Sequence, residues 1–230
     1  MEPTVPAAPR TVVVWEVRRR ELDRAGPAGL CVVDVGGGTG GFAVPLARAG
    51  HTVTVVDASP DALAALARRA AEAGVAGRVH GVQGDADALA SLVPPGGADL
   101  VLCHSVLEVV DDPGQVAAAV AATLRPGGAA SVLVANRAAA VLARAMAGQL
   151  PGATALLQDA DGRGPRRFDL ESAGALLTKA GLQIEQVHGV RVIADLVPGA
   201  VLDRDPDALV AFELASARRA PYRDIATQLH

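Results

Sequence analysis

Aromatic residues are scarce in this 230-residue sequence: three Phe, one Tyr and one Trp make up only 2% of it. Half of the residues are apolar, so the interior must be packed with Ala, Val and Leu. A chain of this length and hydrophobicity can bury a substantial core, which argues against disorder. The scarcity of aromatic residues therefore excludes an aromatic core but not a folded protein.

Cysteine and lysine are scarce as well. The two cysteines, Cys31 and Cys103, fall in stretches that are expected to be buried strands, which excludes a disulfide framework. No pair of potential ligands has the spacing of a zinc site, so we expect no metal. Lys179 is the only lysine, so nearly all basic residues are arginines. The pair Arg68-Arg69 is typical of a solvated helix face.

A membrane span, a secretion signal and a strongly basic surface are also missing. No run of about 18 apolar residues is present, so we expect no membrane-spanning helix. The first residues, Met-Glu-Pro-Thr, lack the basic and then apolar pattern of a secretion signal, and we expect a cytoplasmic protein. The net charge of −4 argues against binding nucleic acid over the whole surface, but it allows a local basic patch.

The first half of the sequence contains a regular alternation of strands and helices. Valine-rich stretches alternate with segments whose apolar residues recur at helical spacing. This alternation predicts an α/β fold with a parallel sheet, right-handed crossovers and helices on both faces. The expected strands are residues 30–35, 52–56, 79–83, 99–103 and 129–135, and the expected helices are residues 10–24, 41–49, 60–74 and a segment from Pro113 to the turn Arg125-Pro-Gly-Gly128.

The second half of the sequence is less regular. We expect residues 1–230 to form one domain, with a helical and loop insertion at about residues 137–168. The expected elements are helices at residues 137–149, 169–181 and 206–219, a polar loop at residues 151–167, and the last two strands at residues 182–193 and 222–230.

A glycine cluster follows the first expected strand, in the string Asp34-Val-Gly-Gly-Gly-Thr-Gly40. Glycines between a strand and a helix leave backbone N–H groups accessible, and open α/β sheets bind nucleotides at such a loop. Gly36, Gly38 and Gly41 satisfy the pattern G-x-G-x-x-G, and Asp57 follows sixteen residues later at the end of the second strand. By itself this pattern also fits an NAD-dependent oxidoreductase or a non-catalytic cofactor-binding protein.

Three further motifs make the pattern more specific. Gly84-Asp85-Ala86 ends the third strand, His104 ends the fourth, and Leu124-Arg-Pro-Gly-Gly128 precedes the fifth. Together with the glycine string and Asp57, in this order and spacing, they resemble the S-adenosylmethionine-dependent methyltransferases of the Rossmann-like class. The resemblance implies a three-layer sandwich with a seven-stranded, mostly parallel sheet whose last strand is antiparallel. It also implies S-adenosylmethionine as the cofactor and S-adenosylhomocysteine as the product.

The same resemblance implies which residues bind the cofactor. The backbone of residues 36–40 would cradle the methionine end, and Asp57 would hold the ribose hydroxyls. Asp85 would face the adenine, with Asp87 as a rival for this role. The expected cofactor-binding residues are Arg10, Asp34, Gly36, Gly37, Gly38, Gly40, Asp57, Ala58, Asp85, Ala86 and His104.

Motifs over most of the chain narrow the resemblance to the tRNA 5-carboxymethoxyuridine methyltransferases, which esterify the carboxylate of a modified wobble uridine. This resemblance implies that Arg10 contacts the carboxylate of the cofactor, that His104 also contacts the cofactor, and that tRNA is the partner. A small-molecule acceptor is the alternative. The motifs are Arg10 five residues before Trp15, His104-Ser-Val-Leu-Glu108, Gly189-Val-Arg191-Val and Ala220-Pro-Tyr222.

The kind of acceptor decides what the protein must supply. Methyl transfer from a sulfonium is an in-line displacement, in which alignment is the main task. A carboxylate acceptor has a pKa of about 4, so it is ionised at neutral pH and needs a cation rather than a base. A hydroxyl or amine acceptor would need a base, for which His104, Glu108, His188 and His230 are available. The candidates for binding an acceptor carboxylate are Arg137, Arg167, Arg191 and Arg223.

Overall fold

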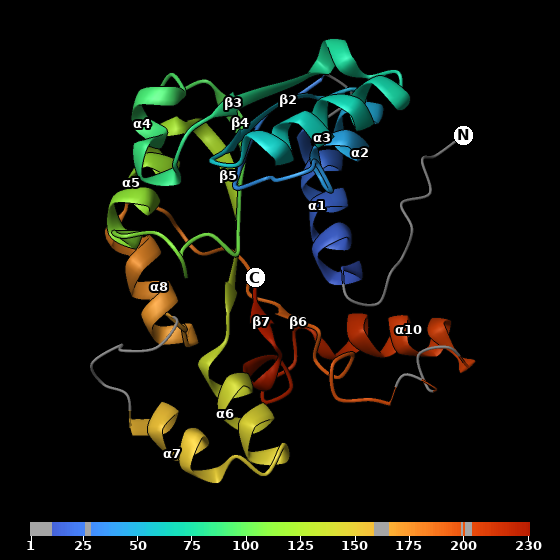
Figure 1. The fold of residues 1–230 in the computed structure, drawn as a ribbon, viewed down its shortest axis with the longest axis vertical. Coiled ribbons are helices and arrows are strands. Elements are labelled where there is room, and N and C mark those ends of the chain that lie inside the picture. Colours follow the sequence, from blue (N-terminus) through green and yellow to red (C-terminus); the bar gives the residue numbers. More distant parts are fainter. Residues whose placement is uncertain (1–10, 26–28, 159–165, 199, 201–203) are drawn as a thin grey trace. The chain divides into compact units, whose positions relative to one another are not determined.

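The computed structural model describes residues 11–25, 29–158, 166–198, 200 and 204–230 (Figure 1). The chain divides into two compact units. Unit 1 contains Glu21–Val132 and Leu176–Leu182, and unit 2 contains residues 11–20, Leu133–Ala175 and Gln183–His230. None of the helices in the described ranges combines the length and the apolar character that crossing a lipid bilayer requires.

Unit 1 alternates strands and helices in the expected order. Ser59 caps the helix after the second strand, because its hydroxyl accepts the N–H of Ala62 at 3.2 Å, and Pro60 fits the first turn of that helix. The strands are β1 (Cys31–Val35), β2 (Thr52–Asp57), β3 (Val79–Gln83) and β4 (Ala98–His104), and the helices are α2 (Ala43–Arg48), α3 (Pro60–Glu72), α4 (Leu89–Leu92) and α5 (Pro113–Thr123), with 3₁₀ turns η1 (Ala76–Arg78) and η2 (Ala86–Ala88).

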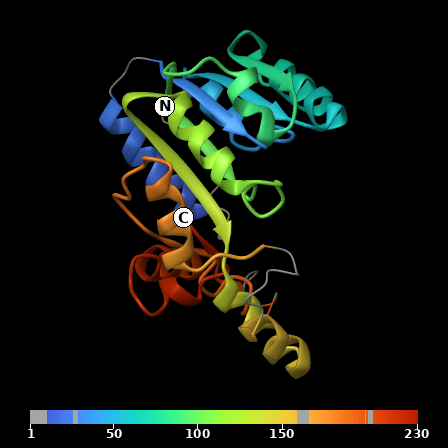
Figure 2. The ribbon, with the colours of Figure 1, turned by 90° about the vertical axis from the view of Figure 1, so that its left-hand side faces the viewer.

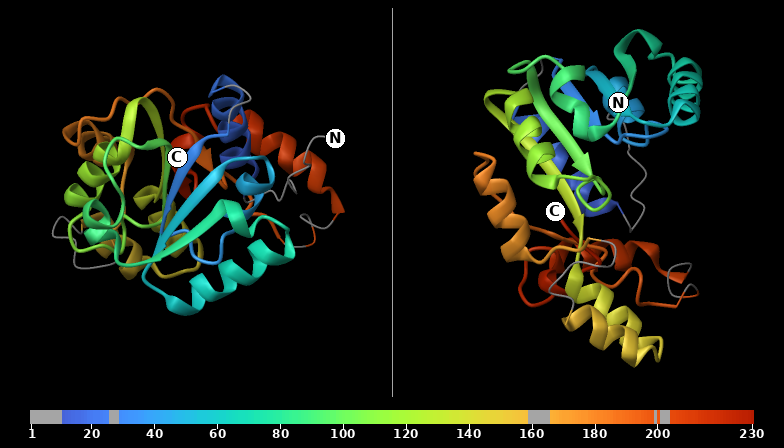
Figure 3. Two further views of the ribbon diagram at one scale, coloured as in Figure 1. Left: turned by 90° about the horizontal axis from the view of Figure 1, so that it is seen from above. Right: turned by 60° about the vertical axis from the view of Figure 1, so that its left-hand side comes forward.

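The four strands of unit 1 are parallel, and their carboxyl ends lie together. β1 pairs with β2 on one side and with β4 on the other, and β3 pairs with β2 (Figure 3). In this register Val35, the last residue of β1, lies beside Val56 of β2 and Cys103 of β4. The loops that follow these strands therefore start from one edge of the sheet.

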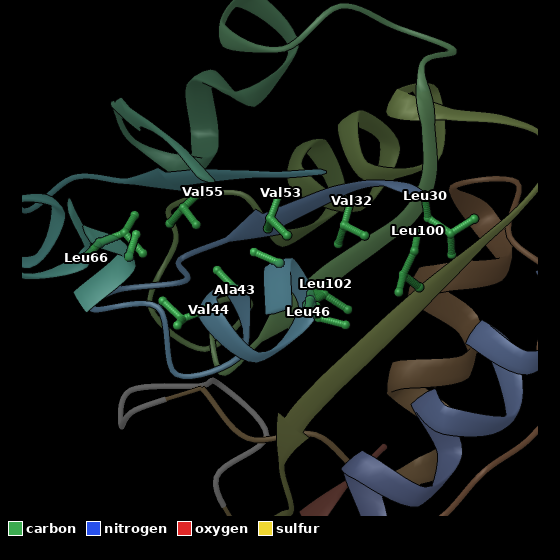
Figure 4. Packing of buried hydrophobic residues seen from close by; sticks show 12 residues of the cluster. Leu30, Val32, Ala43, Val44, Leu46, Val53, Val55, Leu66, Leu100 and Leu102 are labelled. Carbon is green, nitrogen blue, oxygen red and sulfur yellow. The ribbon is translucent and has the colours of Figure 1, made fainter. Parts of the chain in front are cut away.

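The core of unit 1 is aliphatic, as the scarcity of aromatic residues predicts (Figure 4). Leu46 of α2 and Leu66 of α3 are each 1% exposed, and they belong to the same cluster as Val53 and Val55 of β2. Burying one such side chain stabilises a fold by about 2 kcal/mol. Leucine and valine side chains thus hold α2 and α3 against the sheet.

The two cysteines have different environments. Cys103 is 1% exposed, and its burial, together with the charges of Glu108 and Asp34, raises the pKa of its thiol to about 12. Cys31 is exposed, so the expectation that it is buried is wrong. The exposure is confined to the first residue of β1, because the four residues that follow it in the strand are buried.

Strand β5 (Leu124–Ala135) begins five residues earlier than expected. The turn Arg125-Pro-Gly-Gly128 already runs close to the start of β4, because a Cβ atom on Gly128 would lie 3.0 Å from the carbonyl oxygen of Ala98. A Cβ contact of this length is unusually tight, which favours glycine at this position. Figure 2 shows β5 as one continuous strand, whose last three residues belong to unit 2.

Unit 2 contains the remaining elements. Two of the helices begin in unit 2 and end in unit 1. Helices α6 and α7 are packed side by side (Figure 3). The elements are α6 (Arg137–Met146), α7 (Leu150–Gln158), β6 (Gly189–Val190), α10 (Pro206–Ser216), the 3₁₀ turn η3 (Arg223–Ile225) and β7 (Gln228–Leu229), and the shared helices are α1 (Val12–Ala25) and α8 (Leu170–Lys179).

The sheet has seven strands in the order β3-β2-β1-β4-β5-β7-β6. The last strand, β7, is antiparallel to both of its neighbours, β5 and β6. The expected mostly parallel, Rossmann-like sheet with its final strand antiparallel is confirmed.

The loop expected at residues 151–167 is wrong in its first part, because residues 150–158 form α7. Pro151 lies in the first turn of this helix, where its missing N–H removes no hydrogen bond, and the Ala and Leu residues after it favour a helix. Residues 159–165 of the expected loop lie outside the described residues.

The last two expected strands are much shorter than predicted. Residues 182–193 contribute only the two residues of β6, and residues 222–230 contribute only the two residues of β7. Arg191 has a φ of 58°, a left-handed conformation that ends β6. The turn η3 takes up the residues before β7.

His51, which precedes β2, is buried in its neutral form. Its side chain is 8% exposed, and its Nδ1 atom accepts the N–H of Leu30 at 3.1 Å, which requires that atom to carry no proton. Burial is the main cause that lowers the pKa of His51, and the charge of Arg78 adds to it, whereas Asp99 acts in the opposite direction.

We predict that His51 makes the protein less stable in mild acid. The folded protein holds this proton less tightly than the unfolded chain, in which histidine titrates near pH ~6.5. The free energy of unfolding should therefore be unaffected by His51 above that pH and should fall as the pH drops below it. His51→Asn keeps an acceptor for Leu30 but does not titrate, so this loss should disappear.

Urea unfolding at pH values of about 7.5, 6 and 5, followed by circular dichroism, measures the difference between wild type and variant. Asp99 does not interfere in this range: burial raises its pKa, but the N–H of Cys31 and the side chain of Arg125 outweigh burial and lower it from 3.8. Its contribution is lost only in stronger acid. Equal losses in the two proteins would contradict the role of His51.

Candidate functional site

The glycine string after β1 forms a loop that is tied to the end of β2. Gly36, Gly38 and Gly40 have φ values of 67°, 56° and 79°, in the left-handed region that favours glycine. Gly36 donates its N–H to the carbonyl oxygen of Val56 at 2.8 Å, and Gly40 donates to Gly37 at 3.0 Å. The sequence therefore fixes a narrow loop whose backbone, rather than its side chains, is available at the edge of the sheet.

Packing also keeps side chains out of this loop. A Cβ atom on Gly37 would lie 2.5 Å from Oδ2 of Asp34, and one on Gly40 would lie 2.2 Å from Cδ1 of Leu66. Asp34 itself is 2% exposed, so its carboxylate lies buried against the loop. The structure thus places Asp34 where it supports the shape of the loop.

Asp57, the last residue of β2, holds the loop through its carboxylate. Its Oδ2 atom accepts the N–H of Gly38 at 2.8 Å, and its Oδ1 atom accepts the N–H of Ser59 at 2.9 Å. A carboxylate offers about four acceptor positions, so about two more donors can be accommodated. Two hydroxyl groups of a ribose fit that capacity. Ala58, between Asp57 and Ser59, is exposed.

The structure separates the roles of Asp85 and Asp87. Asp87 accepts the N–H groups of Asp111 at 3.2 Å and Asp112 at 3.3 Å, so it holds the segment before α5. Asp85 caps η2, whose first residue is Ala86, by accepting the N–H of Asp87 at 3.2 Å. Asp85 is therefore the better candidate to meet a ligand beyond β3.

His104 ends β4, and two side chains of unit 1 fix its ring. Its Nε2 atom lies 2.8 Å from the hydroxyl oxygen of Ser131 on β5. Phe42 contacts the ring edge to face, with the centroids 5.2 Å apart and the planes at 88°. The chain turns directly after it, because Ser105 has a φ of 55°. These contacts leave the imidazole in a defined position at the carboxyl end of β4.

Arg69 is a residue of this site that the sequence analysis missed. It projects from α3, and its Nη1 atom donates to the carbonyl oxygen of Thr39 at 2.9 Å and lies 3.1 Å from the Thr39 hydroxyl oxygen. Thr39 lies between Gly38 and Gly40 in the loop. Arg69 is exposed, as expected of a solvated helix face, but it also contacts the loop, and nothing in the sequence distinguishes it from Arg68.

Unit 1 thus brings the glycine loop, Asp57 and His104 to the carboxyl ends of β1, β2 and β4, and Asp85 follows β3. Arg10 lies outside the described residues, so its contact with the cofactor stays a prediction.

The ends of β5, β6 and β7 in unit 2 gather the predicted arginines along one edge. The N–H of Thr227 donates to the carbonyl oxygen of Arg191 at 3.2 Å, and the N–H of Asn136 donates to that of Thr227 at 3.1 Å. Because β5 and β6 both run antiparallel to β7, Asn136 and Arg191 lie at the carboxyl ends of their strands. Arg137 follows Asn136, and Arg223 lies in η3 just before β7.

Asn136 ties this edge together. It is 2% exposed, and its amide group donates to the carbonyl oxygens of Asp224 at 2.9 Å and Ala226 at 2.8 Å. Its Oδ1 atom accepts the N–H of Ala138 at 3.0 Å, and its backbone pairs with Phe168, the residue after Arg167. The only signal of this role in the sequence is an asparagine directly after an expected strand.

Two of the four arginines have an acidic neighbour in the chain. The Nε atom of Arg223 donates to Oδ1 of Asp224 at 2.7 Å. The Nε atom of Arg191 lies 3.3 Å from Oδ2 of Asp195, which is within ion-pair distance but lacks the geometry of a hydrogen bond. The contact of Arg191 is therefore the looser of the two.

The other two arginines contact each other. The Nη2 atom of Arg137 donates to the carbonyl oxygen of Arg167 at 3.3 Å. The charge of Arg137 also helps to lower the pKa of Asp169, although hydrogen bonds from Ser172 are the larger cause. Arg137 thus sits between an acidic side chain and the backbone that carries Arg167.

Two of the candidate bases pair with each other in unit 2. His188 and His230 exchange backbone hydrogen bonds of 2.8 Å in both directions, and their ring centroids lie 6.1 Å apart. His188 is 3% exposed, so a substrate in solution has little access to it.

Comparison with known proteins identifies relatives of both units. Residues 32–128 match a family model described as a methyltransferase domain. A tRNA 5-carboxymethoxyuridine methyltransferase of Escherichia coli strain K12 is 33% identical over 229 residues, covering 96% of this chain and 86% of the relative. A ubiquinone biosynthesis O-methyltransferase of Xanthomonas euvesicatoria pv. vesicatoria strain 85-10 is 34% identical over 169 residues, covering 71% of this chain and 66% of the relative.

A solved structure shares the fold. An S-adenosylmethionine-dependent methyltransferase from Mesorhizobium loti is similar with a TM-score of 0.62 and 21% sequence identity, covering 94% of this chain and 95% of the other.

We predict that Asp57→Ala weakens binding of S-adenosylhomocysteine by about tenfold or more, because it removes the ribose acceptor and the acceptor of the Gly38 N–H. Asp57→Asn keeps one acceptor oxygen and should lose less. The far-UV circular dichroism should not change, since the side chain lies at a strand end and leaves no cavity in the core. Isothermal titration calorimetry measures the affinity, and an unchanged dissociation constant would contradict the assignment.

We predict that Arg69→Ala weakens binding of S-adenosylhomocysteine by roughly threefold to tenfold, because Thr39 loses the cation that holds it. Adenosine, which lacks the methionine end, should bind equally well to wild type and variant. Arg68→Ala is the matched control, since it removes the same charge from the same helix and should leave both affinities unchanged. Equal effects of the two substitutions would show that only the charge of α3 matters.

Proposed function

This chain belongs to the S-adenosylmethionine-dependent methyltransferases, and from that premise we propose that it methylates the carboxylate of 5-carboxymethoxyuridine at the wobble position of tRNA. The observation that carries the proposal is the 33% identity to the tRNA-modifying relative, which extends over 96% of the chain and so over both units. Residues 1–230 then act as one methyltransferase domain, and a tRNA acceptor implies a cytoplasmic enzyme. Membership of this family rules out the alternative that the chain is an NAD-dependent oxidoreductase.

Unit 1 would hold the cofactor. The left-handed glycines expose the backbone of residues 36–40 to the methionine end, and the spare acceptor positions of Asp57 suit the ribose hydroxyls. Asp85 and Ala86 would face the adenine, and His104 and Arg10 would complete the set. S-adenosylmethionine, when bound, supplies a methyl group on a positively charged sulfur.

The arginines at the edge of unit 2 would hold the acceptor carboxylate. This carboxylate has a pKa of about 4, so it is ionised at neutral pH and no residue has to remove a proton. Arginine has five N–H donors, so one acidic neighbour does not exhaust it. Arg191 is the leading candidate, because its contact with Asp195 lacks hydrogen-bond geometry, and Arg137, Arg167 and Arg223 are the others.

The charge of the chain bears on how tRNA would be bound. Because the net charge is −4, the surface as a whole would not attract phosphates, so contacts with them would have to come from local arginines. The arginines of unit 2 are the candidates. Asp195 and Asp224 offset part of this local charge. Recognition would therefore depend more on the modified base than on the phosphate backbone.

The second candidate is methylation of a hydroxyl group on a small molecule. It is favoured by the similarity to the ubiquinone biosynthesis O-methyltransferase, which covers 71% of this chain. A hydroxyl acceptor must lose a proton, so this reaction needs a base. His104, which is held by Ser131 at the end of β4, is the best placed of the candidates, since His188 is 3% exposed.

We predict that tRNA from cells lacking this protein has lost the methyl ester on the wobble uridine and has accumulated the free carboxylate, because the esterification that we propose for this protein no longer takes place. Mass spectrometry of tRNA nucleosides measures both forms. A nucleoside profile identical to that of the parent strain would rule out the tRNA acceptor and favour the small-molecule candidate.

The same cells allow a test of Arg191. Arg191→Asn should restore the ester poorly, with kcat/KM for the tRNA lowered by about tenfold or more, because the carboxylate loses its cation. Asparagine tolerates the left-handed backbone of this position. Arg218→Asn is the control, since Arg218 is an exposed arginine of the same unit that is not among the candidates for binding the acceptor, and it should restore the ester fully.

A further inference from the structure

Glu213 of α10 is a fully buried carboxylate that accepts three backbone hydrogen bonds. Its exposure is 0%. Its Oε2 atom accepts the N–H of Val192 at 2.8 Å, and its Oε1 atom accepts those of Ile193 at 2.9 Å and Ala194 at 2.8 Å. Helix α10 and strand β6, from which these donors follow, both belong to unit 2 (Figure 1).

Burying a carboxylate costs free energy unless hydrogen bonds compensate it. Here three hydrogen bonds from one short segment provide that compensation. Successive N–H groups that converge on one anion form a concave nest, and charge-assisted bonds to such a nest are strong. The three donors to Glu213 are backbone groups of consecutive residues. The carboxylate thus fixes the course of the main chain directly after Arg191.

Arg191, which directly precedes this nest, has an unusual backbone conformation. Its φ of 58° lies in the left-handed region, which is unfavourable for arginine. Its carbonyl oxygen accepts the N–H of Thr227 at 3.2 Å, so both sides of the residue are held. The backbone bonds on either side therefore maintain a conformation that an arginine would not adopt by preference.

The turn also decides which way the side chains lie. Val190, Val192 and Ala194 are each 1% exposed, whereas the side chain of Arg191 is 26% exposed. Within residues 190–194 only Arg191 and Ile193 are partly exposed, and the bonds to Glu213 fix the backbone that follows Arg191.

We propose that Glu213 is a positioning residue for the methyl acceptor, which sets the backbone of Arg191 so that its guanidinium meets the acceptor carboxylate. The inference rests on the proposed function, in which Arg191 binds that carboxylate. Glu213 touches neither the cofactor nor the acceptor, and it acts only through the turn at residues 191–194.

The first test measures the position of Arg191 without any acceptor. In Glu213→Gln the amide oxygen can still accept from Ile193 and Ala194, but the amide nitrogen faces the N–H of Val192 and loses that bond. The Arg191 Nε resonance, identified by its loss in Arg191→Asn, should shift, and the amides of residues 192–194 should exchange faster with solvent. Asp207→Asn, an exposed acid-to-amide change on the same helix, should alter neither. Unchanged resonance and exchange in Glu213→Gln would overturn the inference.

The second test measures the consequence for the reaction. With tRNA that carries 5-carboxymethoxyuridine, Glu213→Gln should raise the KM for tRNA about tenfold, with kcat changed less than about twofold and the dissociation constant of S-adenosylhomocysteine unchanged. A merely structural role would lower activity with both substrates together or not shift KM at all. In an Arg191→Asn background, Glu213→Gln should add no further loss, whereas an equal loss in both backgrounds would contradict action through Arg191.

Two outcomes separate this inference from the proposed function. If wild type does not methylate that tRNA, the proposed acceptor fails, and the resonance and exchange measurements still decide whether Glu213 holds Arg191. If Glu213→Gln does not fold, Glu213→Asp carries the same tests, because it keeps the charge but is one methylene shorter and displaces the turn toward α10.

Discussion

Where a strand ends, backbone N–H groups lose their partners in the sheet and need another acceptor. The rest of this structure depends on carboxylates that accept these groups. Asp57 accepts one such group after β1 and one after β2, Asp87 accepts two before α5, and Glu213 accepts three after β6. Charge-assisted bonds of this kind hold loops without side-chain packing. The same strand ends carry the groups that would meet cofactor and acceptor, so the residues that complete the fold also shape the site.

The sequence predicts unit 1 well because its signals are local. Valine runs, glycine turns and the cap Ser59 lie next to the elements that they define, and β2 and β3 begin where they were expected. Unit 2 is predicted less well because long-range bonds decide it. β6 stops at Val190 since Glu213, twenty-one residues from Val192, draws the next N–H groups away. No local pattern announces such a bond.

The candidate site divides in the same way. The glycine loop and Asp57 follow from their spacing, whereas Arg69 has the same helical exposure as Arg68 and is recognised only from its bonds to Thr39. The family model lies within unit 1, at residues 32–128, and the predicted acceptor arginines lie in unit 2. The family model thus matches one unit, whereas the arginines that we propose for the acceptor lie in the other.

The scarcity of aromatic residues has an optical consequence. The only tryptophan, Trp15, and the only tyrosine, Tyr222, both belong to unit 2. Tryptophan and tyrosine fluorescence therefore comes from residues of unit 2, while far-UV circular dichroism reports on the helices and strands of both units. Coincident unfolding curves from the two signals would show one cooperative transition, and separate curves would show that each unit melts by itself. The wild-type chain thus carries its own reporter for the cooperativity of its two units, with no label attached.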